Sequence, residues 1–238
     1  SSLPTNIQAR RAIAHGLIPP VTWRNGGLME ALLYAGIGQL VIFPMFFVGN
    51  LYLQSILNFS PLASGSAFLP LCGIVILTAT NAGRWLRYGA RQSLAAGFAL
   101  VTVGLMWLSL AGMNSVYWLD ILGPTLLVGA GLPVIAITTS ILGAQSAKIG
   151  EEGLTSGLLN TFQQFGAVIG LAVMVSTANF YAAHLAGTGQ TPAATELMNG
   201  YTMSFLLGGL VAALATACLL ISMILRRGGA TREPMTKG

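Results

Sequence analysis

Charged side chains are scarce in this sequence. Asp, Glu, Lys and Arg together make up only 7% of its 238 residues, whereas a typical soluble domain has about 25%. Hydrophobic residues make up 54%, and the mean hydropathy is +0.75. So few charges cannot cover a folded chain with a polar surface, which excludes the ordinary soluble classes. We expect the apolar surface to face a lipid bilayer.

Cysteine is also scarce, and the common catalytic motifs are absent. Cys72 and Cys218 lie in separate apolar runs without a CxxC spacing or a neighbouring His, which predicts that both pack in the interior and bind no metal. The sequence contains no GxSxG, HExxH or GxxxxGK[ST] motif and no paired acids within an apolar run. We expect no enzymatic activity, no metal and no cofactor.

Apolar runs of about twenty residues recur along the chain, and this is the length a helix needs to cross a hydrocarbon core of roughly 30 Å. Backbone groups cannot hydrogen-bond to lipid, and the alternating pattern of a barrel strand is missing, so each run is expected to be helical. The sequence predicts an all-α polytopic membrane protein. Its six predicted spans are residues 28–49, 62–82, 92–112, 118–142, 157–181 and 201–225.

The positive charges are sorted to one side of these spans. All eleven Lys and Arg residues lie before the first span, between spans two and three or four and five, or after the sixth. The opposite connections, residues 50–61, 113–117 and 182–200, contain none. The positive-inside rule predicts that the basic side and both termini are cytoplasmic, in a plasma membrane that we expect to be a bacterial inner membrane.

The segments that flank the spans are short. Residues 1–25 are predicted to be a cytoplasmic N-terminal segment and residues 228–238 a disordered cytoplasmic tail, which leaves residues 26–227 as the transmembrane bundle. The net charge of +5 does not indicate nucleic-acid binding, because the basic residues form short clusters between apolar runs.

Two acids lie near the ends of predicted spans. Glu30 lies about one turn inside the first span and Asp120 at the outer start of the fourth. Either carboxylate could carry a proton in a transport cycle. Alternatively, each interacts with the helix dipole and reaches interfacial water.

Gln39 lies near the middle of the first span, too deep to reach water easily. Helical spacing places it on one face with Leu32, Ala35, Gly36 and Phe43. This face is suited to a cavity for an amphipathic molecule, with Gln39 and Phe43 as candidate lining residues. An interhelical hydrogen bond from the Gln39 amide is the alternative.

The stretch GLLNTFQQFG, residues 157–166, adds several polar side chains to an apolar run. On a helix, Asn160, Gln163 and Gln164 project to one side, and in lipid that side should face protein or water. Two interpretations remain open. The amides either hydrogen-bond to a neighbouring helix or form one wall of a hydrated passage.

Small residues recur four apart in GAGLP, GLTSG and GAVIG, residues 129–133, 153–157 and 166–170. This spacing lets helix backbones approach closely. It indicates a compact bundle without indicating a particular function.

Three longer stretches together resemble the C-terminal half of fourteen-span drug:proton antiporters of the major facilitator superfamily. LYLQSILNFSPLASGSAFLP, residues 51–70, is similar to an external connection and its following span. GPTLLVGAGLPVIAITTS, residues 123–140, resembles the glycine-rich helix, and EEGLTSGLLNTFQQFGAVIGLAV, residues 151–173, resembles a cytoplasmic loop and the next helix. Because the chain begins with Ser1, we expect it to be a piece of a longer protein.

The resemblance implies that the first, second, fourth and fifth spans line a central path. It places Gln39, Asn160, Gln163 and Gln164 on the path side, where they would serve a water-lined passage and the seam with the absent N-terminal half. The family often has Arg where Gln163 stands, so a cationic handle is missing here.

The loop AGRWLRYGAR, residues 82–91, resembles the superfamily pattern G-x-x-x-D-R-x-G-R. The resemblance implies a conformational role for Gly83, Arg84, Arg87 and Arg91. The loop is one residue short and lacks the Asp, which argues against a charge relay through it.

From these patterns we expect part of a secondary active transporter that exports small hydrophobic or amphipathic compounds in exchange for protons by alternating access. Its expected partners are the bilayer, the substrate, protons and the N-terminal half. A metabolite facilitator of the same superfamily and a non-transporting membrane scaffold are the alternatives.

Overall fold

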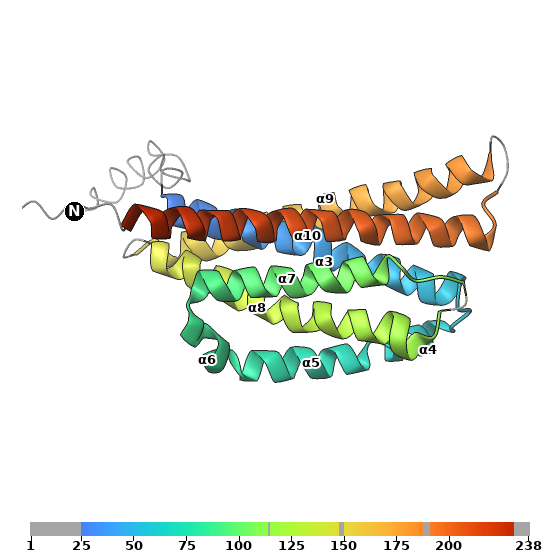
Figure 1. Cartoon of the computed structure of the whole chain (residues 1–238), viewed down its shortest axis with the longest axis horizontal. Coiled ribbons are helices and arrows are strands. Elements are labelled where there is room, and N and C mark those ends of the chain that lie inside the picture. The colour runs from blue at the N-terminus through green and yellow to red at the C-terminus, as the bar shows by residue number, and fades with distance from the viewer. Residues whose placement is uncertain (1–24, 114, 148–149, 188–190, 231–238) are drawn as a thin grey trace, which may run out of the picture.

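The computed structural model describes residues 25–113, 115–147, 150–187 and 191–230 (Figure 1). Within these ranges the chain is a bundle of long helices without a strand. Most of the predicted N-terminal segment and residues 231–238 of the predicted tail lie outside the described residues. The helix at the end of the chain continues through Ala230, so the first residues of that predicted tail are helical.

Six stretches are long and apolar enough to span a membrane, which confirms the predicted six-helix architecture. α4 and α5 together form one of them, and the π-helix η2 continues into α8 to form another. The elements are α3 (Gly26–Ser55), α4 (Pro61–Ser66), α5 (Leu69–Thr80), α6 (Ala82–Trp85), η1 (Leu86–Tyr88), α7 (Ala90–Leu108), η2 (Tyr117–Leu122), α8 (Gly123–Ser146), α9 (Glu152–Ala186) and α10 (Ala194–Ala230).

Several of these helices begin at residues that favour a helix start. The Asn25 side chain caps α3 by accepting hydrogen bonds from the backbone N–H groups of Gly27 and Leu28 at 3.2 and 3.3 Å. Its amide also donates to the Ser146 carbonyl at 2.6 Å, which ties the start of α3 to the end of α8. Gly89 precedes α7 with φ of +98°, a conformation that favours glycine.

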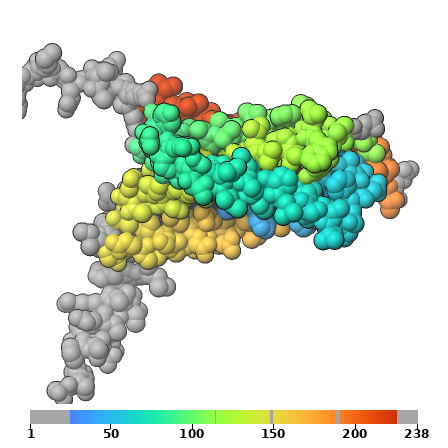
Figure 2. All heavy atoms as spheres, turned by 90° about the horizontal axis from the view of Figure 1, so that it is seen from below, coloured from blue at the N-terminus to red at the C-terminus, as the bar shows by residue number. Residues whose placement is uncertain are grey.

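The first and last three spans repeat one arrangement. α3 packs along α9, while α8, the corresponding first helix of the second set, packs along α5. α7 packs on α8 and α10, and α10 also packs on α3 and α9. Such nested three-helix repeats occur within the halves of many secondary transporters. The repeat is unequal, because α5 packs extensively only against α8 and forms an outer layer of the bundle with α4 (Figure 2).

Glycines allow α3 and α9 to cross closely. A Cβ added at Gly166 would overlap the Gly36 carbonyl oxygen, and one added at Gly170 would overlap that of Leu40. The close approach expected for GAVIG is therefore confirmed. The same expectation is wrong for GLTSG, because no atom lies within 4 Å of a Cβ added at Gly153 or Gly157.

Cys72 and Cys218 are both free thiols on the exposed surface of the bundle, so the prediction that they pack in the interior is wrong. An apolar run predicts that a residue lies in an apolar environment. In a membrane protein that environment is either the protein core or the surrounding lipid.

Candidate substrate path

One end of the bundle carries Arg84, Arg87 and Arg91, together with the start of α3, the end of α8 and the start of α9; we name it the basic end. Here a groove of about 220 Å³ lies between α8 and α9. Five of its eight lining residues carry a hydroxyl or an amide, and Glu152 is the only carboxylate among them. The lining residues are Ser140, Ala144, Glu152, Thr155, Ser156, Leu159, Asn160 and Gln163.

A second, smaller cavity continues this polar surface toward α3. It has a volume of about 20 Å³ and is lined in part by Gln39 of α3, Thr139 of α8 and Gln163 of α9. That volume holds about one water molecule, and the three polar side chains could bind it. Because Gln163 lines both spaces, it links the predicted positions on α3 and α9.

Within the described part of the chain, the amides of the candidate path make no hydrogen bonds with one another or with neighbouring helices. None of Gln39, Asn160, Gln163 and Gln164 has a hydrogen-bond partner among the described residues. Their side-chain atoms are not buried either, since Thr138 Oγ1 is the one buried side-chain polar atom without a partner in the described part. The Thr161 hydroxyl, by contrast, donates to the Gly157 carbonyl of its own helix at 2.8 Å.

Two predicted path residues lie apart from these spaces. Gln164 is exposed on α9 and lines neither the groove nor the small cavity, so the structure separates it from Asn160 and Gln163. Phe43 lies one helical turn beyond Gln39, with 48% of its surface exposed, and it also lines neither space. Both face the surroundings of the bundle.

Glu30 lies on the other side of α3 and forms an ion pair with Arg91 at the start of α7. Arg91 Nε donates to Glu30 Oε1 at 2.8 Å and Nη2 donates to Oε2 at 2.7 Å. The side chains are 33% exposed for Arg91 and 13% for Glu30. This two-point geometry is the strongest form of such a contact, and it fixes α3 against α7.

The basic loop before α7 is held by backbone acceptors. Trp85 Nε1 donates to the Thr78 carbonyl at 3.0 Å, and the Ser93 hydroxyl donates to the Trp85 carbonyl at 2.9 Å. Arg84 and Arg87 are exposed and form no ion pair with a described residue. Gly83 lies in α6 with open space around its Cα. The acid that binds Arg91 therefore comes from α3 and not from the loop.

Asp120 lies in η2 at the opposite end of the bundle. Its Oδ2 atom accepts a hydrogen bond from the Val116 N–H at 2.7 Å. The carboxylate thus satisfies a backbone donor at the start of η2, as a helix cap does. It has no contact with the groove residues.

Several lining residues carried no clear signal in the sequence. Thr139, Ser140, Thr155 and Ser156 line the two spaces but are common in membrane helices of any function. The adjacent hydroxyls of Thr138, Thr139 and Ser140 could have indicated a polar patch on the fourth span. Glu152 precedes the predicted fifth span of residues 157–181, yet it lies in the first turn of α9 and lines the groove.

A family model and several known proteins are similar to this chain. The family model of the Major Facilitator Superfamily matches residues 3–171. The cephamycin export protein CmcT of Amycolatopsis lactamdurans is 34% identical over 84% of this chain and 40% of its own length. The puromycin resistance protein pur8 of Streptomyces alboniger is 31% identical over 90% of this chain and 43% of its own length.

A third relative, the tetracenomycin C resistance and export protein of Streptomyces glaucescens, is 32% identical over 60% of this chain and 27% of its own length. The chain therefore spans less than half the length of these curated relatives. The family match covers most of the chain, in agreement with the six spans. This multi-pass membrane chain belongs to the Major Facilitator Superfamily.

Proposed function

We propose that the chain is the C-terminal six-helix half of a fourteen-span drug:proton antiporter that exports small hydrophobic or amphipathic compounds. Relatives named for antibiotic export or resistance support the direction and the kind of cargo. Their greater length leaves room for an N-terminal half. The basic end would face the cytoplasm of a bacterium, in keeping with the positive-inside rule.

The observation that carries the proposal is the set of amides without partners beside the α8–α9 groove. An amide that bound helices together would donate to or accept from a neighbouring helix, and within the described chain these do not. A polar group left unpaired in hydrocarbon is costly, so water, substrate or the other half must satisfy it. This favours a passage wall over a scaffold.

The groove supplies uncharged donors and acceptors beside apolar surface. Asn160 and Gln163 would hydrogen-bond to polar atoms of the cargo, while Ala144 and Leu159 would contact its apolar parts. Rocking of the two halves about this surface would alternate access between the two sides of the membrane.

We place the proton-carrying acid in the other half of the transporter. Glu30 is held by Arg91 and Asp120 by a backbone N–H, so each carboxylate already has a fixed partner. Glu152 lines the groove, but its Oε2 atom accepts from the Gly150 N–H at 3.0 Å. A coupling acid needs to exchange its proton during the cycle, and none of these three is free of a competing contact.

Proton-dependent extrusion of a lipophilic dye from cells that express the full-length protein tests the proposal. Gln39→Leu and Asn160→Leu should each reduce extrusion by about fivefold, which corresponds to one lost hydrogen bond of about 1 kcal/mol. Gln164→Leu is the matched control, because this amide lines neither space. Undiminished extrusion in both test variants would show that these two amides take no part in transport and would remove the observation that carries the proposal.

A further inference from the structure

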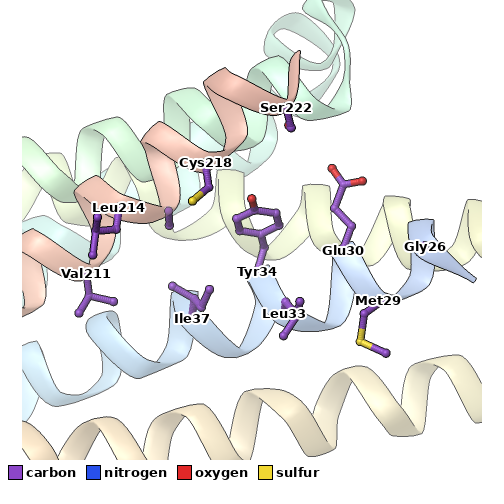
Figure 3. Close-up of a pocket in the computed structure, with 11 residues that line it drawn as sticks. Gly26, Met29, Glu30, Leu33, Tyr34, Ile37, Val211, Leu214, Cys218 and Ser222 are labelled. Atoms are coloured by element: carbon purple, nitrogen blue, oxygen red, sulfur yellow. The ribbon is translucent and has the colours of Figure 1, made fainter. Parts of the chain in front are cut away.

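A large hollow lies between α3 and α10, away from the candidate path. It has a volume of about 580 Å³, and no residue of α8 or α9 lines it. We name it the outer groove. Its apolar part is formed by Leu33 and Ile37 of α3 and by Val211 and Leu214 of α10 (Figure 3).

The outer groove is polar at one end only. Glu30 and Ser222 lie toward the basic end, whereas Ile37 and Val211 lie toward the middle of the bundle (Figure 3). Along α10, the distance from Ser222 to Val211 is about 16 Å at 1.5 Å per residue. This is close to half of a hydrocarbon core of roughly 30 Å. The groove therefore extends over the depth of one leaflet, polar at the surface and apolar within.

The ion pair joins this groove to a second pocket at the basic end. Glu30 lines the outer groove, and Arg91 lines a pocket of about 340 Å³ together with Gln92, Gln145 and Met223. Leu142 of α8 also lines that pocket. A molecule with an apolar chain in the outer groove would thus place its head beside Arg91.

The hydrogen bonds between Glu30 and Arg91 indicate which kind of headgroup can bind here. Both oxygens of Glu30 already accept from Arg91, so an added ammonium group would have to compete for them. Arg91 donates through Nε and Nη2, and its Nη1 atom has no partner among the described residues. Nη1 can therefore donate to a phosphate oxygen, which is a favoured partner of guanidinium groups.

We propose that the outer groove binds phosphatidylglycerol from the leaflet at the basic end. One acyl chain would lie between Leu33 and Leu214, and the phosphodiester would accept a hydrogen bond from Arg91. The exposed cations Arg84 and Arg87 of the neighbouring loop would attract an anionic head to this face. An amine-bearing lipid gains nothing from Glu30 while Arg91 holds it.

Native mass spectrometry of the purified chain tests the headgroup. The chain is taken from micelles that contain equal amounts of phosphatidylglycerol, phosphatidylethanolamine and phosphatidylcholine with identical acyl chains. We expect phosphatidylglycerol to be retained about fivefold more than either other lipid, as one surface Arg accounts for about 1 kcal/mol. Arg91→Gln should abolish the preference, and Arg91→Lys should keep most of it.

Glu30→Gln separates the phosphate contact from the ion pair. It leaves the Arg91 cation in place, so the preference for phosphatidylglycerol should persist or rise. A loss as complete as that in Arg91→Gln would overturn the proposal, because the pair would then act only by holding α3 against α7. Equal retention of the three lipids by the unmodified chain, or a preference for phosphatidylethanolamine, would overturn it as well.

The acyl chain is tested by filling the outer groove. Leu214 is 66% exposed and lines the groove, whereas Leu220 is 48% exposed on the same helix and does not. Leu214→Trp should therefore reduce total lipid retention, while Leu220→Trp should not. Because both side chains are exposed, neither variant should prevent folding. Unchanged retention in Leu214→Trp would contradict the proposed position of the chain.

Discussion

The two sides of α3 handle polar groups in opposite ways. Toward α7, the charged pair of Glu30 and Arg91 satisfies itself through two hydrogen bonds. Toward α8 and α9, Gln39 lies beside Gln163, yet neither amide has a partner within the described residues. A neutral amide is cheaper to leave unpaired than a charge. We infer that the side toward α7 holds the bundle together, whereas the amides toward α8 and α9 remain available to water or cargo.

The crossing of α3 and α9 lies on the side of α3 that faces α8 and α9. Disrupting this crossing should cause the largest loss of unfolding free energy. The double substitution Gly166→Ala/Gly170→Ala would push each Cβ into a backbone carbonyl of α3. Helix separation should then lower the free energy of unfolding by about 3 kcal/mol, the upper range for overpacking. Thermal unfolding of the purified chain measures the loss.

Gly157→Ala is the control for this change, because nothing lies within 4 Å of the added Cβ. It should leave the stability unchanged or raise it by up to about 1 kcal/mol, the difference in helix propensity between Ala and Gly. An equal loss of stability in the control and the double variant would mean that Gly166 and Gly170 are not needed for the close crossing.

The next largest loss of unfolding free energy is expected when the Glu30–Arg91 ion pair is broken. Glu30→Gln leaves the Arg91 charge partly buried, which should cost about 2 kcal/mol of unfolding free energy. Loss of one partner of a fully buried pair costs roughly 3–5 kcal/mol, but the Arg91 side chain is 33% exposed. In Glu30→Gln/Arg91→Gln the loss should be smaller than the sum of the single losses. Additivity within about 0.3 kcal/mol would argue against a coupled pair.

Asp120 belongs to neither side and should have a smaller effect. Asp120→Ala removes the acceptor of the Val116 N–H, which should cost about 1 kcal/mol, as the loss of a helix cap does. Asp120→Asn keeps an acceptor oxygen and should cost less. Both variants should retain proton-dependent dye extrusion in the full-length protein. Abolished extrusion in Asp120→Asn at normal expression would restore Asp120 as a proton-linked residue.

Substitution of the unpaired amides beside α8 and α9 should cause the smallest change in stability. Gln39→Leu and Asn160→Leu remove amides that have no partner in the described chain, so unfolding free energy should change by no more than about 0.5 kcal/mol. Chemical denaturation of the purified variants measures this change. A loss of 2 kcal/mol or more in either variant would place that amide among the groups that hold the bundle together.

The six spans could be predicted because each needs a run of apolar residues that few other structures require. Their ends could not, since α9 begins at Glu152 and reaches Ala186, beyond the apolar run on both sides. Helical hydrogen bonds continue into polar sequence outside the hydrocarbon. Hydropathy also could not tell the protein interior from the lipid-facing surface, which is why Cys72 was misplaced.

The candidate site was predictable in kind but not in composition. An unusual cluster of amides marked residues 157–166, yet Gln163 and Gln164 are about 100° apart on a helix, and one lines the groove while the other does not. The partner of Glu30 lies 61 residues away in the sequence. No local pattern specifies such a pair, because it depends on where the bundle places α3 relative to α7.

Accessibility of position 160 to an aqueous reagent would show whether the α8–α9 groove is hydrated. Cys72 and Cys218 are first replaced by alanine in the full-length protein, and Asn160→Cys and Leu220→Cys are made in that background. Both positions are exposed on the bundle. If the α8–α9 side lines a hydrated passage, a membrane-impermeant cationic thiol reagent applied from the basic side will modify position 160. It will leave position 220 unmodified, because this position on α10 lines neither the groove nor the small cavity. Equal protection of both cysteines would contradict the account, since position 160 would then face hydrocarbon or protein.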